Sequence, residues 1–324
     1  MNNPSSAIIN PLVTIAIPTY ERADGYLKIA LESALNQTYP NIEILVSDNC
    51  SPDDTEKVVK SYADARVRYY RQHAPLVPND NFNFCLHESR GAFFLLLHDD
   101  DEIDRDFVET CTKAMHSSPS CGLVRTGTRI INSQGQVVGE NPNLAGGLTT
   151  AELFLAWFEG RTAPYLCSTL FNTELLREAG GFRSRHNLFQ DVAAHFRLAA
   201  QFGRVDVREA KASFRKHGSN ATGATAIRAW CEDSIYLLSL MCRLAPEQAE
   251  EIRDRGSRFL ARINYSRASA IRTPISRLKG YWVSYRTFGW RNLPPPMLLF
   301  QSTALYRALR TMKRRILGLP AWVD

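Results

Sequence analysis

A run of four acidic residues is the part of this sequence most able to do chemistry. It consists of Asp99-Asp100-Asp101-Glu102, and only His98 separates it from the apolar segment 93–97. Like charges so close together repel one another, and a divalent cation with oxygen ligands is the usual way to compensate them. A solvated acidic turn is the alternative, against which the apolar segment in front argues. The run therefore predicts a metal site at the end of a buried strand.

Three further polar positions could take part in binding or catalysis. Asp48, in Ser-Asp-Asn-Cys-Ser, could accept hydrogen bonds from a base or a ribose, or it could be a turn residue. His217 lies in the basic loop 214–220, which suits phosphates and offers an imidazole to a metal, although a loop histidine can also be a plain surface residue. Asp191 begins a helical pattern, where it could cap the helix or act as a base.

The elements that position these residues follow from the apolar pattern. Short apolar runs predict strands at 13–17, 42–46, 67–70 and 93–97, with helices at 27–35, at 55–62 and from Asn81 between them. Strands that alternate with helices imply right-handed crossovers and a mainly parallel sheet, so we expect an α/β fold. Ligands of such sheets bind beyond the carboxyl ends of the strands. The polar clusters after Ile17, Val46 and Leu97 all fall there.

The pattern changes after residue 97. We expect a hairpin over 122–138, then a Gly/Asn/Pro-rich loop at 139–147 that is a candidate mobile lid. Helices are expected at 149–158, 173–179 and 191–202, and the chain becomes helical and Arg-rich after about residue 227. We therefore place a domain boundary there, between a catalytic domain at 1–227 and a basic, mainly helical region at 228–324.

Composition excludes several classes of protein. The 324 residues are 44% apolar and 22% charged, which is ordinary for a globular chain. The longest apolar run has about six residues, against the ~20 that a bilayer-spanning helix needs. No Lys or Arg precedes Arg22, so a secretory signal is not expected and we expect a cytoplasmic location. The seven cysteines form no CxxC pair, which argues against a zinc knuckle and a disulfide framework.

Positive charge is concentrated at the carboxyl end. The formal net charge is +6, but residues 228–324 carry +10 and residues 1–227 carry −4. A basic amphipathic helix is predicted from the apolar stripe Leu305, Leu309, Met312 and Ile316. It either packs on the catalytic domain or binds an anionic cytoplasmic membrane surface, with Trp322 as an interfacial anchor. Nucleic acid is not an expected partner, because this region lacks a stacking or helix-turn-helix signature.

The absence of several known catalytic motifs argues against dinucleotide-binding, P-loop, zinc-protease and hydrolase functions. The sequence has no GxGxxG opening a helix and no GxxxxGK[ST], HExxH or GxSxG. An ordered set of short motifs resembles instead the inverting family 2 glycosyltransferases of GT-A fold, over about residues 11–220. The set consists of Pro18-Thr19-Tyr20-Glu21-Arg22, Ser47-Asp48-Asn49-Cys50-Ser51 with Asp53 and Thr55, Asp99-Asp100-Asp101, Gly180-Gly181-Phe182 and Gln190-Asp191. The resemblance implies a GT-A type, Rossmann-like sheet flanked by helices.

The resemblance also implies roles for single residues. Thr19, Glu21 and Asp48 are expected to contact the nucleoside, within a donor site that also includes Pro18, Tyr20, Arg22, Asn49 and Asp99. Asp191 is implied as the catalytic base, and His217 as the histidine that helps to hold the metal or the diphosphate. The sequence departs from the family at His98, where Asp is common, at Gln190, where Glu is common, and at Cys50, where Gly is common. The first departure leaves either Asp100 or Asp101 as the main metal ligand, and we favour Asp100.

The chemistry is consistent with these roles. A sugar hydroxyl is a weak nucleophile, so a carboxylate such as Asp191 must take its proton as the new bond forms. The leaving nucleoside diphosphate develops negative charge, which Mn²⁺ or Mg²⁺ can neutralise, with Arg215 and Lys216 near the diphosphate. We predict an inverting, metal-dependent hexosyl- or deoxyhexosyltransferase. Its donor is a nucleotide diphosphate sugar, by default a UDP-sugar, and its acceptor a glycan or lipid-linked glycan in cell-surface polysaccharide or lipopolysaccharide assembly. The alternatives are a non-catalytic nucleotide-sugar-binding protein of the same fold, or a nucleic-acid-binding protein that uses the basic tail.

Overall fold

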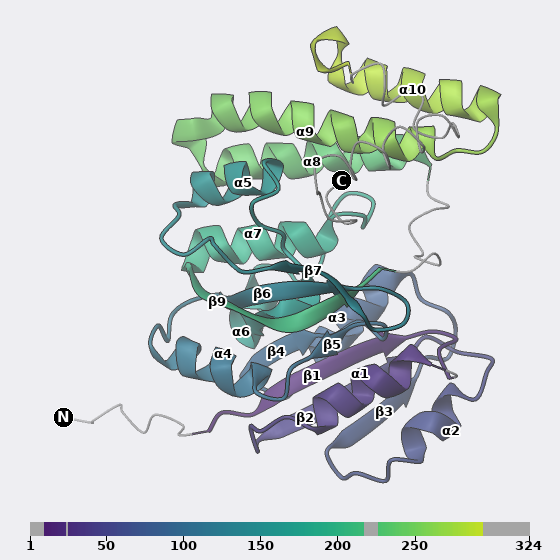
Figure 1. The fold of residues 1–324 in the computed structure, drawn as a ribbon, viewed down its shortest axis with the longest axis vertical. Helices are drawn as coiled ribbons and strands as arrows, with labels where there is room; N and C mark the ends of the chain where they lie inside the picture. Colours follow the sequence, from purple (N-terminus) through teal and green to yellow (C-terminus); the bar gives the residue numbers. More distant parts are fainter. Residues whose placement is uncertain (1–9, 24, 217–225, 294–324) are drawn as a thin grey trace.

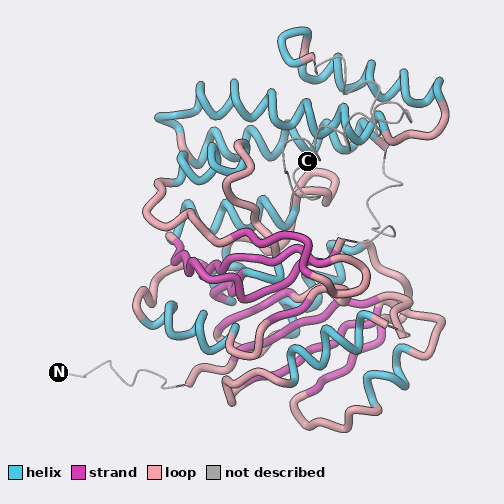
Figure 2. The backbone as a smooth tube through the Cα atoms, in the orientation of Figure 1, coloured by secondary structure: helices cyan, strands magenta, loops and turns pink. Residues whose placement is uncertain are grey.

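A nine-stranded mixed sheet is the centre of the fold in the computed structural model, which describes residues 10–23, 25–216 and 226–293 (Figure 1). The strands are β1 (Val13–Thr19), β2 (Ile42–Asp48), β3 (Val67–Arg71), β4 (Phe93–Leu96), β5 (Glu102–Ile103), β6 (Leu123–Ile131), β7 (Val137–Asn141), β8 (Thr169–Asn172) and β9 (Arg204–Arg215). Their order in the sheet is β3-β2-β1-β4-β8-β6-β9-β5, and β7 pairs with β6. Figure 2 shows the strands as one continuous body with helices around it.

The predicted parallel part of the sheet is confirmed. Strands β3, β2, β1 and β4 are neighbours and pair in parallel. Every residue of β1, β2 and β4 is buried, as expected for strands that are covered on both faces. The strands β5, β7 and β8 are antiparallel to their partners. Both β1 and β2 run two residues past the predicted segments, so Thr19 and Asp48 lie side by side in register at the sheet edge.

Helices follow the predicted apolar stripes. They are α1 (Tyr26–Leu35), α2 (Thr55–Lys60), α3 (Pro78–Glu88), α4 (Phe107–His116), α5 (Thr150–Phe158), α6 (Thr173–Glu178), α7 (Gln190–Phe202), α8 (Ile227–Leu244), α9 (Ala249–Ser269) and α10 (Pro274–Phe288), with short 3-10 turns η1 (Leu166–Ser168), η3 (Pro246–Gln248) and η4 (Trp290–Asn292). In α1 the buried residues are Leu27, Ala30, Leu31 and Ala34, which follow the apolar spacing of the predicted helix at 27–35. Helix α5 begins with a capping box between Thr149 and Glu152.

The carboxyl-terminal helices pack on the rest of the molecule. In Figure 1 helices α8, α9 and α10 form successive layers at the top, with α5 and α7 between them and the sheet. Trp230 and Leu238 of α8 belong to the same hydrophobic cluster as Phe154 of α5 and Phe196 of α7. The helices on the two sides of residue 227 therefore share one hydrophobic core. A domain boundary near residue 227 stays a prediction.

The segment 139–147 is attached to the sheet. Its first three residues belong to β7, and Asn143 and Ala145 are buried. The amide of Asn143 donates hydrogen bonds to the carbonyl oxygen of Arg125 (3.2 Å) and to Oδ1 of Asp206 (2.8 Å). These contacts anchor this part of the segment to the sheet, and its role as a mobile lid stays a prediction.

Two predictions fall outside the described residues. They concern His217 and the basic helix at 305–316 with Trp322. Among the helices that the structure describes, none combines the length and the apolar character needed to cross a bilayer.

Candidate active site

The acidic run begins in the turn beyond the carboxyl end of β4, and its last residue, Glu102, is the first residue of β5. The ligand atoms of His98, Asp100 and Asp101 lie within 4.8 Å of one another. Two carboxylates and one imidazole make a donor set that Mn²⁺ accepts, and Mg²⁺ binds the carboxylates. The three residues therefore fit a divalent cation. His98 replaces a common Asp, and sequence reasoning treated it only as a departure from the family.

Asp101 is the buried member of this group. Its side chain is 1% exposed, Oδ1 accepts a hydrogen bond from the Arg215 backbone N–H (2.9 Å), and the thiol of Cys167 also bonds to it. Burial raises the pKa of Asp101 to about 7, with the Asp100 charge adding to the shift and His98, whose Nδ1 lies 3.8 Å from Oδ2, opposing it. A cation bound beside Asp101 would favour its ionised form.

Arg215 holds the acidic turn in place. Its side chain is 1% exposed. Its Nε donates to the Asp100 carbonyl oxygen (2.8 Å) and its Nη1 to the Asn132 carbonyl oxygen (3.1 Å). Its Nη2 pairs with Glu102, and the guanidinium lies over the Tyr26 ring, 4.7 Å from the centroid. Burial of the guanidinium commits these donors to protein acceptors, and a place for Arg215 near the diphosphate stays a prediction.

The loops after β1 and β2 are bound to each other. Asn49 N–H donates to the Thr19 carbonyl oxygen (2.9 Å), and Glu21 N–H donates to Ser51 Oγ (3.0 Å). Glu21 has φ 53° and Cys50 has φ 64°, both in the left-handed region. Cys50 thus adopts the conformation that glycine takes most easily, so the turn after β2 keeps its shape without glycine.

Asp48 is fully buried at the end of β2. Tyr69 Oη donates to its Oδ2 (2.5 Å), Ser51 N–H donates to its Oδ1 (2.9 Å), and Arg71 Nε lies 3.8 Å from Oδ2. Burial and the Asp48 carboxylate raise the pKa of Tyr69, so its hydroxyl stays a donor. A contact of Asp48 with a nucleoside stays a prediction.

The other predicted donor-site residues differ in how far they are exposed to solvent. Pro18 and Thr19 are buried, whereas Tyr20 and Glu21 are exposed. Arg22 Nε lies 3.7 Å from Oδ1 of Asp99. Burial raises the pKa of Asp99, and the charge of Arg22 opposes part of this rise. These two residues can therefore face a donor as a partly neutralised pair.

Asn49 has a structural role. Its Nδ2 donates to the Leu76 carbonyl oxygen (2.9 Å), and the Leu76 N–H donates to its Oδ1 (2.7 Å). The amide is thus occupied in holding the loop before α3, and a place for Asn49 in the donor site stays a prediction.

Asp191 is half-buried in the first turn of α7. Burial raises its pKa, while a hydrogen bond with the Val192 backbone and the positive potential of His98 lower it. Asp191 therefore lies within electrostatic range of His98, one of the three metal-capable residues. Next to it, Gln190 Oε1 is buried and has no hydrogen-bond partner among the described residues. Such an acceptor is usually satisfied, so a bound hydroxyl would suit it.

Asp233 of α8 organises the loop 184–189 that leads into α7. It is fully buried, and its carboxylate accepts hydrogen bonds from Ser184 Oγ (2.7 Å) and from the backbone N–H groups of His186 (2.8 Å), Leu188 (2.9 Å) and Phe189 (2.8 Å). The first turn of α7, and with it Asp191, is therefore held by a carboxyl-terminal helix. No local signal marks this residue in the sequence, because its partners lie far away along the chain.

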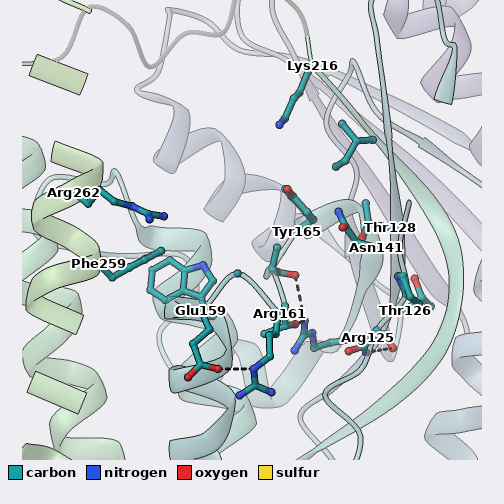
Figure 3. Close-up of a pocket in the computed structure, with 17 residues that line it drawn as sticks. Arg125, Thr126, Thr128, Asn141, Glu159, Arg161, Tyr165, Lys216, Phe259 and Arg262 are labelled. Carbon is teal, nitrogen blue, oxygen red and sulfur yellow. Dashed lines mark hydrogen bonds and ion pairs between the residues drawn. The ribbon is translucent and has the colours of Figure 1, made fainter. Parts of the chain in front are cut away.

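A pocket opens beside the acidic cluster. It has a volume of about 390 Å³ and lies between β6, β7, the loop after α5 and helix α9 (Figure 3). Tyr165 lines it, and the pKa of Tyr165 is raised to about 12 by burial and by the nearby Cys167 and Asp101. Lys216, which was expected near the diphosphate, also lines this pocket and is exposed.

Comparison with known proteins agrees with this arrangement. The family model that describes glycosyl transferase family 2 matches residues 14–152. The chain carries a family 2 glycosyltransferase domain. It is 33% identical to Escherichia coli chondroitin synthase over 135 residues. The matched region covers 41% of this chain and 19% of that protein. It is 38% identical over 96 residues to the Campylobacter jejuni GalNAc(5)-diNAcBac-PP-undecaprenol beta-1,3-glucosyltransferase, covering 29% of this chain and 31% of that protein.

The structural neighbours extend the likeness beyond the family 2 domain. S. aureus TarS (residues 1–349, with UDP-GlcNAc) has a TM-score of 0.65 at 15% identity, covering 96% of this chain and 93% of that one. The mannosyltransferase PcManGT from Pyrobaculum calidifontis, in complex with GDP-Man and Mn²⁺, has a TM-score of 0.56 at 17% identity, covering 96% and 86%. The GT-A fold predicted from the sequence is confirmed, with a helical carboxyl-terminal region.

Proposed function

We propose that this protein is an inverting glycosyltransferase that moves a sugar from a nucleotide diphosphate sugar to an acceptor hydroxyl. The observation that carries the proposal is the position of Asp191. Its carboxylate has a raised pKa and lies within electrostatic reach of His98, which belongs to the metal-capable group at the end of β4. A base beside a cation site, in a domain of this family, suits glycosyl transfer.

The donor is proposed to bind at the carboxyl ends of β1, β2 and β4. Glu21, Asp48 and the Arg22–Asp99 pair lie there, on loops that bond to one another. Solved structures of the same fold contain UDP-GlcNAc in TarS and GDP-Man in PcManGT, which supports a nucleoside diphosphate sugar as the class of donor. A UDP-sugar is our default.

The step itself needs one proton transfer by the protein. The acceptor hydroxyl oxygen forms a bond to the anomeric carbon, while the bond from that carbon to the diphosphate oxygen breaks and its electron pair leaves with the nucleoside diphosphate. Asp191 takes the hydroxyl proton. Burial makes Asp191 a stronger base than an exposed aspartate, because it penalises the ionised form. A single displacement of this kind inverts the anomeric carbon.

His98, Asp100 and Asp101 are proposed to hold Mn²⁺ or Mg²⁺. Such an ion, when bound, neutralises charge on the leaving diphosphate. Arg215 supports the site by fixing the backbone of the acidic turn, and Asp101 is oriented by the Arg215 N–H. A part for His217 in holding the ion stays a prediction.

The acceptor is proposed to be a glycan or a lipid-linked glycan of the cell surface, and the enzyme to work in the cytoplasm, at the membrane if the basic tail binds it. The name of the C. jejuni relative, a transferase that acts on an undecaprenol-linked glycan, supports this class of acceptor.

A screen of the purified protein against nucleotide sugars tests the proposal. Thermal stability and release of the nucleotide are measured with each sugar, in Mn²⁺ and in excess chelator. We expect one donor to stabilise the protein and to be slowly hydrolysed only with metal present. Stabilisation by a nucleotide sugar without turnover, with or without acceptors, would favour the non-catalytic binding protein.

A further inference from the structure

The pocket beside the acidic cluster is lined by aromatic and basic side chains, and we call it the basic pocket. Its aromatic side chains are Trp157, Tyr165 and Phe259, its basic side chains are Arg125, Arg161, Lys216 and Arg262, and Thr126, Thr128, Thr162 and Asn141 supply hydroxyl and amide groups. Glu159 is its one acidic side chain among the described residues. Flat apolar rings with a few polar groups are typical of small-ligand sites, and the volume of about 390 Å³ is in the range of such sites.

Two of the four cations are engaged with protein groups. Arg161 Nε pairs with Oε2 of Glu159 at 2.5 Å. Arg125 is 3% exposed, and its Nη2 donates to Thr162 Oγ1 (2.5 Å). Its Nη1 has no hydrogen-bond partner among the described residues and lies 3.8 Å from Oδ1 of Asp206. Burial lowers the pKa of Arg125 to about 10. A buried guanidinium with an unused donor still has capacity for an acceptor at this site.

The other two cations face the pocket without a counterion. Arg262 points into it from α9, and Lys216 points into it from the end of β9 (Figure 3). Neither forms an ion pair with any carboxylate in the part of the chain that the structure describes, and both are exposed. Lysine and arginine in such a position favour a carboxylate or a phosphate as the ligand.

The pocket is distinct from the predicted nucleoside site. None of Glu21, Asp48 and Asp99 lines it. Two of its residues adjoin groups that hold Asp101, since Tyr165 precedes the turn that contains Cys167, and Lys216 follows Arg215. A ligand in the pocket therefore lies close to residues that hold Asp101 of the metal-capable group.

We propose that the basic pocket binds the acceptor, and that this acceptor is a glycan carrying an anionic group, either a carboxylate or a phosphate. This inference rests on the proposed function. The aromatic rings take the apolar faces of the sugar, the hydroxyl and amide groups bond its hydroxyls, and Arg262 and Lys216 bind the anion.

Direct binding tests the inference without any need for activity. Fluorescent oligosaccharides of equal length are titrated into the full chain in three forms: with a uronic acid, with a sugar phosphate, and neutral. We expect an anionic form to bind more tightly than the neutral form, with affinity that falls as salt is raised. The tighter of the two anionic forms identifies the source of the charge. Equal affinity for all three forms, or none for any, would overturn the inference.

Arg262→Glu separates the pocket from a general effect of positive charge, and Arg253→Glu is its matched control. Both residues are exposed on α9, and Arg253 does not line the pocket. We expect Arg262→Glu to weaken binding of the anionic glycan at least about tenfold and Arg253→Glu to leave it unchanged. An equal loss in both variants would show a diffuse field instead of a site.

Donor hydrolysis without acceptor keeps the two proposals apart. If Arg262→Glu hydrolyses the nucleotide sugar as the wild type does but loses transfer to the anionic glycan, both proposals stand. If the wild type hydrolyses donor and transfers equally well to neutral and anionic glycans, the pocket inference fails alone. If anionic glycans bind but no nucleotide sugar is ever used, the proposed function fails and the binding site stands.

Discussion

Replacing Asp233 by asparagine is expected to slow transfer while leaving donor binding intact. In the wild type Oδ2 accepts three hydrogen bonds, from Ser184 Oγ, Leu188 N–H and Phe189 N–H, and Oδ1 accepts one from His186 N–H. These bonds hold the loop that leads into α7 and the proposed base. Neither Asp233 nor this loop belongs to the predicted donor site.

The size of the effect follows from the four bonds. An asparagine whose carbonyl takes the place of Oδ2 keeps three of them, but its NH₂ group then faces the His186 N–H. Loss of one hydrogen bond to a charged group costs about 1.5 to 3 kcal/mol. The three remaining bonds lose their charge assistance and become about half as strong. The loop is therefore less well held, and a shift of the base by ~1 Å can cost about 10²-fold in rate. We expect kcat to fall by about one to two powers of ten with little change in the donor KM.

The assay compares kcat, donor KM and hydrogen exchange over residues 184–189 in the wild type, Asp233→Asn and Asp254→Asn. Asp254 is an exposed aspartate of α9 that pairs with Arg258, so it controls for the same chemical change outside the loop. Faster exchange together with an unchanged kcat in Asp233→Asn would refute a positioning role. A rise in KM alone would show that the loop serves donor binding instead.

Three other predictions concern the metal, the pH dependence and the basic tail. Asp100→Ala should weaken nucleoside-diphosphate binding only when Mn²⁺ or Mg²⁺ is present, and calorimetry with equal affinity in metal and in chelator would exclude the metal role. Because burial raises the pKa of Asp191 and the base must be ionised, kcat should decrease as pH falls through a value above the ordinary aspartate pKa of about 3.9. A pH profile that stays flat to that ordinary value would contradict the prediction. A chain that ends at Pro296 should sediment less with anionic liposomes than the full chain, whereas equal sedimentation would favour a tail packed on the protein.

The parallel strands and their ligand edge could be predicted from the sequence because they depend on local pattern. Short apolar runs identified β1, β2, β3 and β4, and the same runs placed Asp48 and the acidic turn at the carboxyl ends of strands. The buried face of α1 could also be predicted from local sequence, because apolar residues at i, i+3 and i+4 lie on one face of a helix.

Long-range pairing explains what could not be predicted. Arg215 resembled a phosphate ligand because of its residue type and its basic neighbours. Its burial results from the pairing of β9 with β5, which brings Glu102 and the acidic turn to it. Asp233 lay in the segment that was predicted only to be helical and Arg-rich, and only the packing of α8 on the loop before α7 reveals its four partners. The segment 139–147 had the composition of a mobile loop, but Asn143 pairs with Asp206 of β9, which is remote in sequence.

The central claim is that Asp191 removes a proton from the acceptor hydroxyl. The most direct measurement is a single-turnover transfer assay with Asp191→Asn, run alongside equilibrium binding of the donor. We predict a rate lower by about 10² to 10⁴, with donor affinity equal to that of the wild type. Transfer by Asp191→Asn at close to the wild-type rate would contradict the claim.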